Sequence, residues 1–211
     1  MQLEYAKMLK WIQHNHPDQI WRFVESVSPN QQASKDSLIF GLMEKDVVVP
    51  RNKDGMINIE IVGGWFGWPL IGNLINHFGE MINRIDFFEI DPIACSFLRK
   101  YIELMKPRFE IRIFEMDWFE YKESRRTHVL INTSCEHMPD LISQRPYFID
   151  AHRTLLMLTS NDKVDEPDHI NCKESADQLA ADNKVKLLHG DHLVFEDYTR
   201  FVVIGKWGCV E

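Results

Sequence analysis

Residues 57–70 read INIEIVGGWFGWPL, and residues 84–92 read RIDFFEIDP. Both are largely apolar, as buried strands are, and the first ends in a turn with three glycines: Gly63, Gly64 and Gly67. The second ends on two acids, Glu89 and Asp91. A glycine turn lets the backbone approach a ligand, and an acid at the next strand tip can bind ribose hydroxyls. Together the two segments predict a site for a nucleoside-bearing cofactor.

After residue 56, patterns typical of strands alternate with patterns typical of helices. We expect strands at residues 57–62, 84–90, 109–115, 127–132, 153–159, 184–195 and 198–207. We expect helices at residues 68–80, 92–105, 139–149 and 174–183. Strands that alternate with helices are parallel and joined by right-handed crossovers. Only Glu196 and Asp197 separate the last two strands, so these two are expected to form an antiparallel hairpin.

The first 45 residues carry helical patterns and no strand pattern. We expect helices at residues 3–14, 17–27 and 35–45, the last of them capped by Ser34. We interpret residues 1–45 as a helical prefix that packs on a core of residues 57–207. The whole chain, residues 1–211, is then expected to form a single domain.

The composition is that of an ordinary globular protein, with 211 residues of which 45% are hydrophobic and 27% charged. The formal net charge of −8 disfavours nucleic acid as a partner, because nucleic-acid sites need clustered lysine and arginine. Arg125-Arg126 and Lys184-x-Lys186 are the local basic candidates. No run approaches the roughly 20 apolar residues of a membrane span, and the first residues do not resemble a secretory signal. The four cysteines are scattered, so we expect reduced thiols in a cytoplasmic protein with no membrane partner.

The order of these motifs resembles that of the class I S-adenosylmethionine (SAM)-dependent methyltransferases, over about residues 57–207. The resemblance rests on the glycine turn, the segment Glu89-Ile90-Asp91-Pro92 and the terminal hairpin. It implies a Rossmann-like α/β methyltransferase fold, with a seven-stranded, mostly parallel sheet and S-adenosyl-L-methionine as the cofactor. The turn departs from the family's more common G-x-G-x-G pattern, and the acid often found just before it would be Glu60.

The resemblance also implies which residues hold the cofactor. Its methionine part would lie against the turn residues Gly63, Gly64, Trp65, Phe66 and Gly67. Glu89 would bind the ribose, with Asp91 as the second candidate. Asp117 would lie near the adenine amine, and Trp118 would cover the adenine face. Lys35 is expected at the cofactor carboxylate. Two further residues are also expected at the cofactor, namely Asn132 and Ser134.

The segment after the fourth strand would lie at the reacting edge of the sheet. Glu136 and His137 are the predicted catalytic pair there. A histidine titrates near neutral pH and can take a proton from an acceptor, and a nearby carboxylate raises its basicity. His169 and Asn171, after the fifth strand, are the predicted substrate contacts.

Three other uses of this edge are disfavoured by the sequence. Cys135 follows a serine and not the proline that precedes the nucleophilic cysteine of cytosine-C5 methyltransferases. The segment 132–135 also lacks the paired prolines of the amino-methyltransferases that act on DNA bases. Cys135, His137, His169 and Cys172 are expected near this edge, but their spacing matches no known zinc signature, so no metal is assigned.

We therefore predict a SAM-dependent methyltransferase that acts on a small molecule or an otherwise unknown acceptor. One alternative is a nicotinamide-dependent oxidoreductase, which shares the glycine turn and the ribose acid but is opposed by the terminal hairpin and the absent G-x-G-x-x-G. Another is a SAM-binding protein with other chemistry or with no catalytic activity, which the unusual glycine turn favours.

Overall fold

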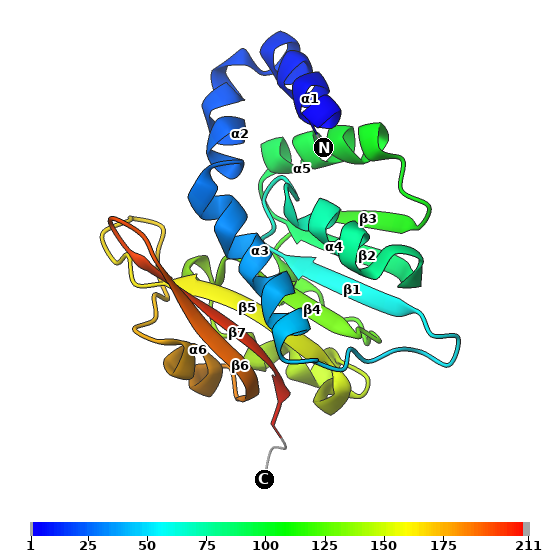
Figure 1. Cartoon of the computed structure of the whole chain (residues 1–211), viewed down its shortest axis with the longest axis vertical. Helices are drawn as coiled ribbons and strands as arrows, with labels where there is room; N and C mark the ends of the chain where they lie inside the picture. Colours follow the sequence, from blue (N-terminus) through cyan, green and yellow to red (C-terminus); the bar gives the residue numbers. More distant parts are fainter. Residues whose placement is uncertain (1, 209–211) are drawn as a thin grey trace.

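The computed structural model describes residues 2–208, so Cys209 lies outside the described residues. Three helices come first, namely α1 (Gln2–Asn15), α2 (Ile20–Ser26) and α3 (Pro29–Glu44) (Figure 1). The remaining helices and strands are β1 (Ile57–Val62), α4 (Leu70–Phe78), β2 (Ile82–Glu89), α5 (Pro92–Met105), β3 (Glu110–Glu115), β4 (Val129–Asn132), β5 (Leu155–Asn161), α6 (Ala176–Asp182), β6 (Val185–Val194) and β7 (Thr199–Trp207). Short 3-10 helices lie between them: η1 (Pro17–Gln19), η2 (Gly79–Met81), η3 (Trp118–Glu120), η4 (Cys135–His137), η5 (Leu141–Tyr147) and η6 (Ala151–Arg153).

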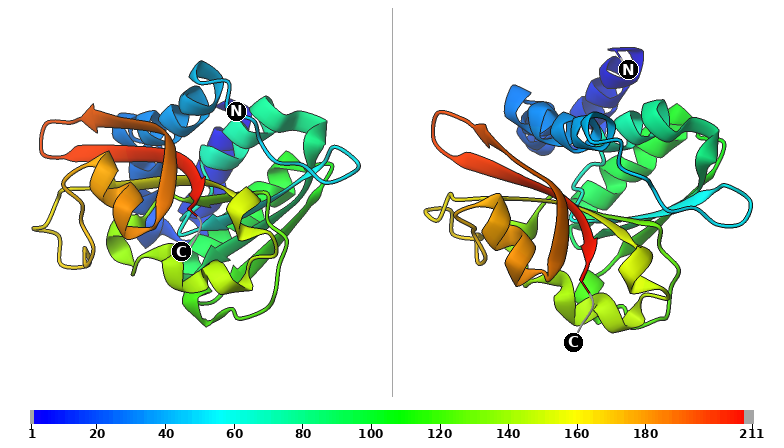
Figure 2. Two further views of the ribbon diagram at one scale, coloured as in Figure 1. Left: turned by 90° about the horizontal axis from the view of Figure 1, so that it is seen from below. Right: turned by 60° about the horizontal axis from the view of Figure 1, so that its bottom comes forward.

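The strands form one seven-stranded sheet in the order β3-β2-β1-β4-β5-β7-β6. Strands β1 to β5 pair in parallel, whereas β7 runs antiparallel to both β5 and β6 (Figure 2). The predicted mostly parallel sheet with an antiparallel terminal hairpin is therefore confirmed. The strand order reverses between β1 and β4, and ligands of α/β proteins bind at the carboxyl ends of the strands beside such a reversal.

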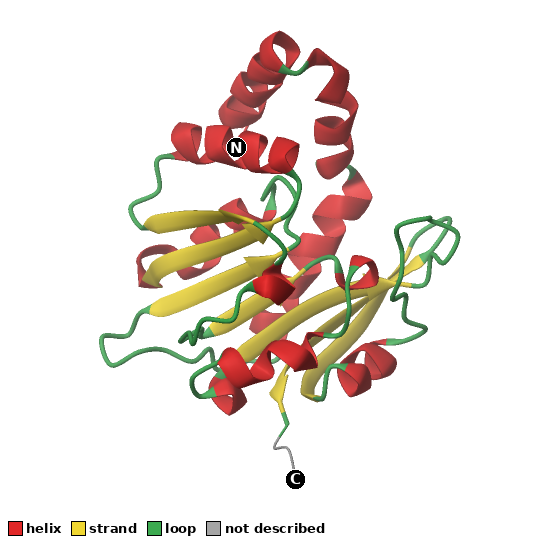
Figure 3. Ribbon diagram, turned by 180° about the vertical axis from the view of Figure 1, so that it is seen from behind, coloured by secondary structure: helices red, strands yellow, loops and turns green. Residues whose placement is uncertain are grey.

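Helices cover both faces of the sheet (Figure 3). Helices α1 to α5 lie on one face, where their apolar side chains join those of the strands in one cluster: Met8, Phe23, Leu38, Leu74 and Phe97. The 3-10 helices η3 to η6 and helix α6 contribute to a second cluster with the strand side chains of the other face. Helices α1 to α3 thus pack on the sheet through this shared apolar cluster. This packing fixes the position of their polar residues relative to the strand ends. Within residues 2–208, no helix is both long and apolar enough to cross a membrane.

Helix α3 begins earlier than the sequence predicts. Its N-cap is Ser28, whose hydroxyl accepts a hydrogen bond from Gln31 N, and Pro29 occupies the first helical position. Ser34 therefore does not cap the helix as predicted but lies buried within it. The Ser-Pro pair is the stronger start signal because proline costs little where the first N–H groups have no helical partner.

The predicted helix at 139–149 is also wrong. This stretch forms the 3-10 helix η5, with Pro146 inside it. Proline has no N–H to donate and clashes with the preceding turn, so an α-helix is not stable over this segment. The first residue of η5, Leu141, donates its N–H to Asn183 Oδ1 at 2.6 Å, which ties the segment to α6. The other predicted elements are confirmed, with ends shifted by a few residues.

Candidate functional site

The segment after β1 turns sharply at the carboxyl edge of the sheet. Gly63, Trp65 and Gly67 have positive φ angles of 59°, 54° and 70°. This conformation is easy for glycine but strained for tryptophan. Only glycine fits at position 64, because an added Cβ would lie 2.4 Å from the Phe87 ring. The glycines of the predicted cofactor turn are therefore demanded by its backbone path and by its close packing on β2.

Glu89, the last residue of β2, holds this turn in place. Its Oε2 accepts a hydrogen bond from Trp65 N at 3.0 Å, and its Oε1 accepts one from Asp91 N at 3.1 Å. Burial raises the pKa of Glu89, although the backbone donors act in the opposite direction. Each carboxylate oxygen keeps a second lone pair, so Glu89 can still accept a hydrogen bond from a ribose hydroxyl. Asp117, after β3, is exposed at the same edge, and its role near an adenine stays a prediction.

Asp91, the second ribose candidate, has both oxygens engaged. Oδ1 caps α5 by accepting from Ile93 N at 2.8 Å, and Oδ2 accepts from Arg22 of α2. The Arg22 guanidinium carbon also lies 5.8 Å from the ring centroid of Trp65. Arg22 therefore links α2 to the glycine turn and to the start of α5. No local pattern predicts this contact, because a single arginine on an amphipathic helix does not indicate which distant residue it will contact.

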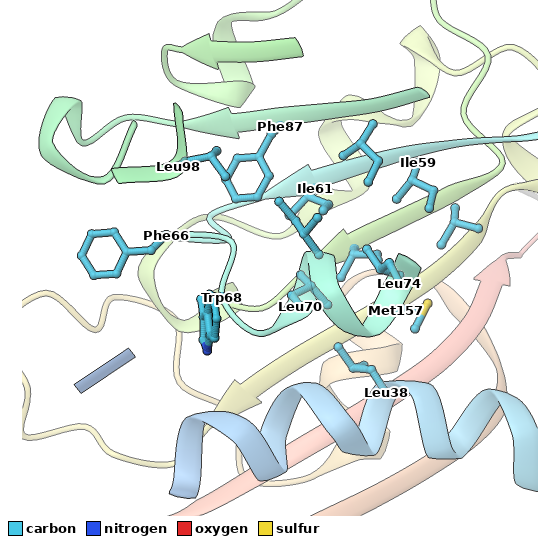
Figure 4. Packing of buried hydrophobic residues seen from close by; sticks show 14 of the residues in the cluster. Leu38, Ile59, Ile61, Phe66, Trp68, Leu70, Leu74, Phe87, Leu98 and Met157 are labelled. Carbon is cyan, nitrogen blue, oxygen red and sulfur yellow. The ribbon is translucent and has the colours of Figure 1, made fainter. Parts of the chain in front are cut away.

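The aromatic residues of the turn divide into core and surface. Phe66 is 1% exposed and its ring packs near those of Phe23 and Phe97, at centroid distances of 6.5 and 4.9 Å. Figure 4 shows Phe66 and Trp68 among the buried hydrophobic residues. The Phe66 ring therefore has no free surface for a cofactor, and a contact through its backbone in the turn stays a prediction. Trp65 is half-buried and stacks on Phe66, and its contact with a cofactor stays a prediction.

Trp118 and Glu60 meet in a buried cluster on the face that η3 covers. Trp118 is 2% exposed and donates its indole N–H to Glu60, so the prediction that its ring covers an adenine is wrong. Glu60 also accepts from Arg125 Nε, at 3.1 and 3.0 Å, and from Thr127 Oγ1 at 2.9 Å. Burial raises the pKa of Glu60, and the charge of Arg125 acts against that rise. Glu60 is therefore a structural ion-pair partner and not the acid of the glycine turn, and Arg125 is not part of a basic surface.

The loop after β4 closes against the glycine turn. The hydroxyls of Thr133 and Ser134 donate to Gly63 O at 3.3 and 2.8 Å. Asn132 is buried, and its Oδ1 accepts from Ser134 N at 2.8 Å. A Cβ on Gly63 would lie 3.1 Å from both Ser134 Cβ and Met138 Cε. The structure thus brings the predicted cofactor residues Gly63, Asn132 and Ser134 together at the point where the strand order reverses.

Glu136, in η4 beyond this loop, is buried at the same edge. Its Oε1 accepts a hydrogen bond from Asn161 Nδ2 at 2.8 Å and lies 3.5 Å from Arg200 Nη2. Asn161 and Arg200 face each other in the register of β5 and β7, so their side chains project from the same face of the sheet. Sequence reasoning missed both residues. The available signal was an arginine directly before the apolar run Phe201–Ile204 of the strand Thr199–Trp207.

His137 and His169 come together as the sequence predicts, from two different loops. Their ring centroids are 4.6 Å apart, and His137 Nδ1 lies 3.1 Å from Asp168 Oδ2. Cys135 points away into the core, where burial raises the pKa of its thiol. Cys172 lies beside the pair, with its Sγ 3.6 Å from His169 Nδ1.

Asn171, the other predicted substrate contact, is engaged within the chain. Its Nδ2 donates to Met138 O at 2.9 Å and to Asp140 Oδ1 at 3.1 Å, and its Oδ1 accepts from Lys173 Nζ at 2.7 Å. These bonds hold the loop after β5 against the loop after β4. They make Asn171 a residue that positions the edge, and its contact with a substrate stays a prediction.

Lys35 is buried on α3, the helix that packs against β5 and β7. Its Nζ donates to Gln31. Burial lowers the pKa of Lys35 to about 7, with the charge of Arg200 acting in the same direction and that of Glu136 against it. Lys35 thus belongs to the same charged cluster as Glu136 and Arg200, and its predicted contact with a cofactor carboxylate stays a prediction.

Several buried polar atoms around this cluster have no hydrogen-bond partner among residues 2–208. They are Ser34 Oγ, Glu136 Oε2, Thr159 Oγ1 and Arg200 Nε. A buried donor or acceptor left without a partner costs about 1–3 kcal/mol, and native proteins contain few of them. Their concentration between α3, η4, β5 and β7 indicates a place where water or a polar ligand group completes the hydrogen bonding.

A separate hollow of about 290 Å³ lies at the amino ends of the strands, on the opposite edge. It is lined mainly by polar and charged residues, among them Arg51, Lys53, Arg126 and Arg153. None of the predicted site residues lines it. The converging polar groups of Glu136, Asn161 and Arg200 instead lie at the carboxyl edge, where α/β sheets bind their ligands.

Comparison with known proteins gives a result only at the level of structure. No family model matches the sequence, and no curated protein matches it either. The chain is similar to the structure of the N-methyltransferase NodS from Bradyrhizobium japonicum in complex with S-adenosylhomocysteine (SAH). The TM-score is 0.63 at 13% identity, over 96% of this chain and 97% of that one.

Two further solved structures show the same similarity. One is magnesium protoporphyrin IX methyltransferase from Synechocystis with bound SAH, at TM-score 0.60 and 12% identity over 97% of this chain and 100% of that one. The other is geranyl diphosphate C-methyltransferase from Streptomyces coelicolor with Mg²⁺, geranyl diphosphate and SAH. Its TM-score is 0.58 at 8% identity, over 83% of this chain and 79% of that one. The chain therefore has the class I SAM-dependent methyltransferase fold.

Proposed function

We propose that this protein is a SAM-dependent methyltransferase that acts on a small molecule. The observation that supports the proposal best is the contact between the glycine turn and Glu89 in a sheet with the methyltransferase strand order. Trp65 N of the turn donates to Glu89 at 3.0 Å, and Ser134 of the β4 loop donates to Gly63 O at 2.8 Å. The glycine turn, the acid that could bind a ribose and the loop after β4 therefore meet where the strand order reverses.

The residues present fit SAM. A Cβ at position 63 would crowd Ser134 and Met138, so Gly63 keeps space free beside the turn. Glu89, at the end of β2, can still accept a hydrogen bond. The glycine turn and Ser134 would hold the methionine part, Glu89 the ribose, and Asp117 the adenine amine. SAM supplies an activated methyl group on a sulfonium.

Glu136 and His137 are proposed to serve the acceptor. Methyl transfer requires the acceptor atom to be oriented toward the methyl group and, for an oxygen or nitrogen acceptor, relieved of a proton. His137 is partly exposed, with its Nε2 4.0 Å from Glu136 Oε1, and can take that proton. The buried polar cluster beside Glu136 offers hydrogen-bond partners to the rest of a small polar acceptor.

Native mass spectrometry tests the cofactor class directly. The purified full-length chain would be mixed separately with SAM, with SAH and with NADH at equal concentrations. We expect one bound SAM or SAH per chain and no retained NADH. Retention of NADH alone would contradict the proposal and favour the oxidoreductase alternative, which the terminal hairpin already opposes.

Product analysis then separates methyl transfer from other uses of SAM. Conversion of SAM to SAH in the presence of a panel of small polar acceptors is the expected result, with a mass increase of one methyl group on one acceptor. Formation of methylthioadenosine would instead indicate transfer of the aminoalkyl group. Glu136→Gln is expected to lower turnover while SAH binding is retained.

A further inference from the structure

We propose that Glu136, His137 and His169 form a binding site for one first-row transition-metal ion of the Zn²⁺ type. One ligand atom from each residue lies within 4.8 Å of the other two. Glu136 and His137 come from η4 and His169 from the loop after β5, so chain folding and not local sequence creates the cluster. This is why no zinc signature is visible in the spacing.

The imidazoles are oriented as metal ligands usually are. His169 Nδ1 lies 2.6 Å from Lys163 O, and His137 Nδ1 lies 3.1 Å from Asp168 Oδ2. A carbonyl or carboxylate on one ring nitrogen fixes the tautomer and leaves the other nitrogen free to bind an ion. Both histidines therefore already have the outer partners that metal-binding histidines require.

The backbone holds the two loops at a fixed spacing. Ile170 N and Asn171 N both donate to Glu136 O at 2.9 Å, immediately after His169. The carbonyl of a proposed ligand thus anchors the loop that carries another ligand. In tetrahedral zinc sites, bond lengths of about 2.0–2.2 Å place ligand atoms roughly 3.4 Å apart. The ligand atoms, within 4.8 Å of one another, would have to approach by about 1 Å to reach that spacing.

Glu136 provides an independent observation that points to a ligand. Its side chain is 3% exposed, and its Oε2 has no hydrogen-bond partner among residues 2–208. Asn161 and Arg200 are both placed at Oε1, which leaves Oε2 as the oxygen to be satisfied. A cation held by His137 would meet the carboxylate at Oε1, 4.0 Å from Nε2, and would satisfy Oε2 through bidentate contact. Asp168 adds a second negative charge beside the site, against the positive charges of Arg200 and Lys35.

The donor set selects the kind of ion. Two imidazoles and one carboxylate suit Zn²⁺, Co²⁺ or Mn²⁺, whereas Mg²⁺ and Ca²⁺ prefer oxygen ligands throughout. Three protein ligands leave a coordination position open, as in catalytic rather than structural zinc sites. The site shares Glu136 and His137 with the proposed acceptor site, so an ion bound there would activate the acceptor in place of proton transfer to His137. Its test measures metal binding and not turnover, and is therefore separate from the test of the proposed function.

The test is calorimetric titration of ZnCl₂ into the full-length chain after treatment with a chelator and its removal. We expect one Zn²⁺ per chain. His137→Ala and His169→Ala should each weaken binding by at least the 10- to 100-fold that loss of an outer-shell partner alone costs. His152→Ala is the matched control, because His152 is exposed on η6 at the amino end of β5, and it should leave the affinity unchanged. Circular dichroism of each variant confirms that the fold is intact.

Cobalt gives a second readout that does not depend on affinity. Co²⁺ in the wild-type chain should show visible absorption bands of low-coordinate geometry, and the double variant H137A/H169A should lose them. The proposal is overturned if the wild type binds no ion, or if the double variant keeps wild-type affinity. Loss of binding in Cys172→Ser together with retention in both histidine variants would also overturn it, because the thiol would then hold the ion.

Discussion

Arg125 and Arg126 are adjacent in the chain but lie in opposite environments. The side chain of Arg125 is 7% exposed and pairs with Glu60, which is 1% exposed. The side chain of Arg126 is 59% exposed and lies 3.8 Å from Asp150. Removing one partner of a buried pair leaves an uncompensated charge, whereas an exposed pair contributes little. Position in the fold, and not residue type, therefore decides what each arginine contributes.

Arg125→Met is expected to lower the free energy of unfolding by about 3–5 kcal/mol, the usual cost of breaking a buried pair. Arg126→Met, its matched control, should cost less than about 1 kcal/mol. Urea unfolding of both variants measures the difference. Equal losses in the two variants would show that the Glu60–Arg125 pair does not stabilise the second face of the sheet.

Because Lys35 is buried, the stability of the protein is expected to depend on pH. Its pKa falls from 10.5 in the unfolded chain to about 7 in the folded one, because of burial first and Arg200 second, with Glu136 opposing. Between these two values the unfolded chain binds more protons, so Lys35 makes stability rise with pH there. Below pH 7 both states are protonated and the full cost of the buried charge is present.

Lys35→Met removes this cost and should stabilise the protein more at pH 6 than at pH 9, by on the order of 2 kcal/mol. The exposed Lys53→Met is the control and should show no such pH dependence. Unfolding in urea at the two pH values gives the measurement. A gain from Lys35→Met that is the same at both pH values would mean that the lysine keeps its charge in the folded protein.

At the scale of elements, Arg22 of α2 is the polar link between the helical prefix and the cofactor edge. It pairs with Asp91 at the start of α5, and both side chains are partly buried, at 20% and 26% exposure. The apolar contacts of Phe23 hold the same helix on the sheet. Loss of the ion pair should therefore loosen α2 without unfolding the core.

Arg22→Gln is expected to speed hydrogen–deuterium exchange of α1 and α2 several-fold while β1, β4 and β5 stay protected. Arg108→Gln serves as the control, because Arg108 and Glu80 pair with side chains about nine-tenths exposed, at 90% and 89%. Unchanged exchange in α1 and α2 of Arg22→Gln would show that apolar packing alone holds the prefix.

The elements that the sequence predicts well are those with strong local signals. The helix 92–105 is found with its predicted ends, because Asp91 caps it and Pro92 begins it. The pairing of Glu60 with Arg125 and Trp118 could not be predicted, since the partners lie far apart in the chain and only the register of β1 brings them together. The same holds for Arg200, which meets Glu136 through the antiparallel pairing of β5 and β7.

The candidate site was predicted in location more than in detail. Six predicted site residues lie at the carboxyl edge, as the alternation of strands and helices requires: Gly63, Ser134, Glu89, Glu136, His137 and His169. The rings of Phe66 and Trp118 lie in the core although the sequence predicts them at the cofactor, because an aromatic residue beside a cofactor turn and one in the core have the same appearance in a sequence. Burial depends on the helices packed above, which local patterns do not give.

In the whole molecule, the side chains proposed to serve the cofactor and the acceptor gather at one edge of the sheet. Glu89 with the glycine turn occupies the β1–β2 side, and Glu136 with Arg200 and Lys35 occupies the β4–β5–β7 side. The Gly63–Ser134 contact joins the two sides. This arrangement allows a cofactor and an acceptor to lie side by side, as methyl transfer requires.

Calorimetric titration of SAH into the wild type and into Glu89→Gln measures cofactor binding at this edge. The wild type should bind one SAH per chain. Glu89→Gln should bind at least tenfold more weakly, because hydrogen bonds to a charged group contribute about 1.5–3 kcal/mol each. Glu115→Gln, at the end of β3 and paired with Arg99, is the control and should bind as the wild type does. Absence of SAH binding to the wild type, or equal affinity in Glu89→Gln, would contradict the proposed cofactor site.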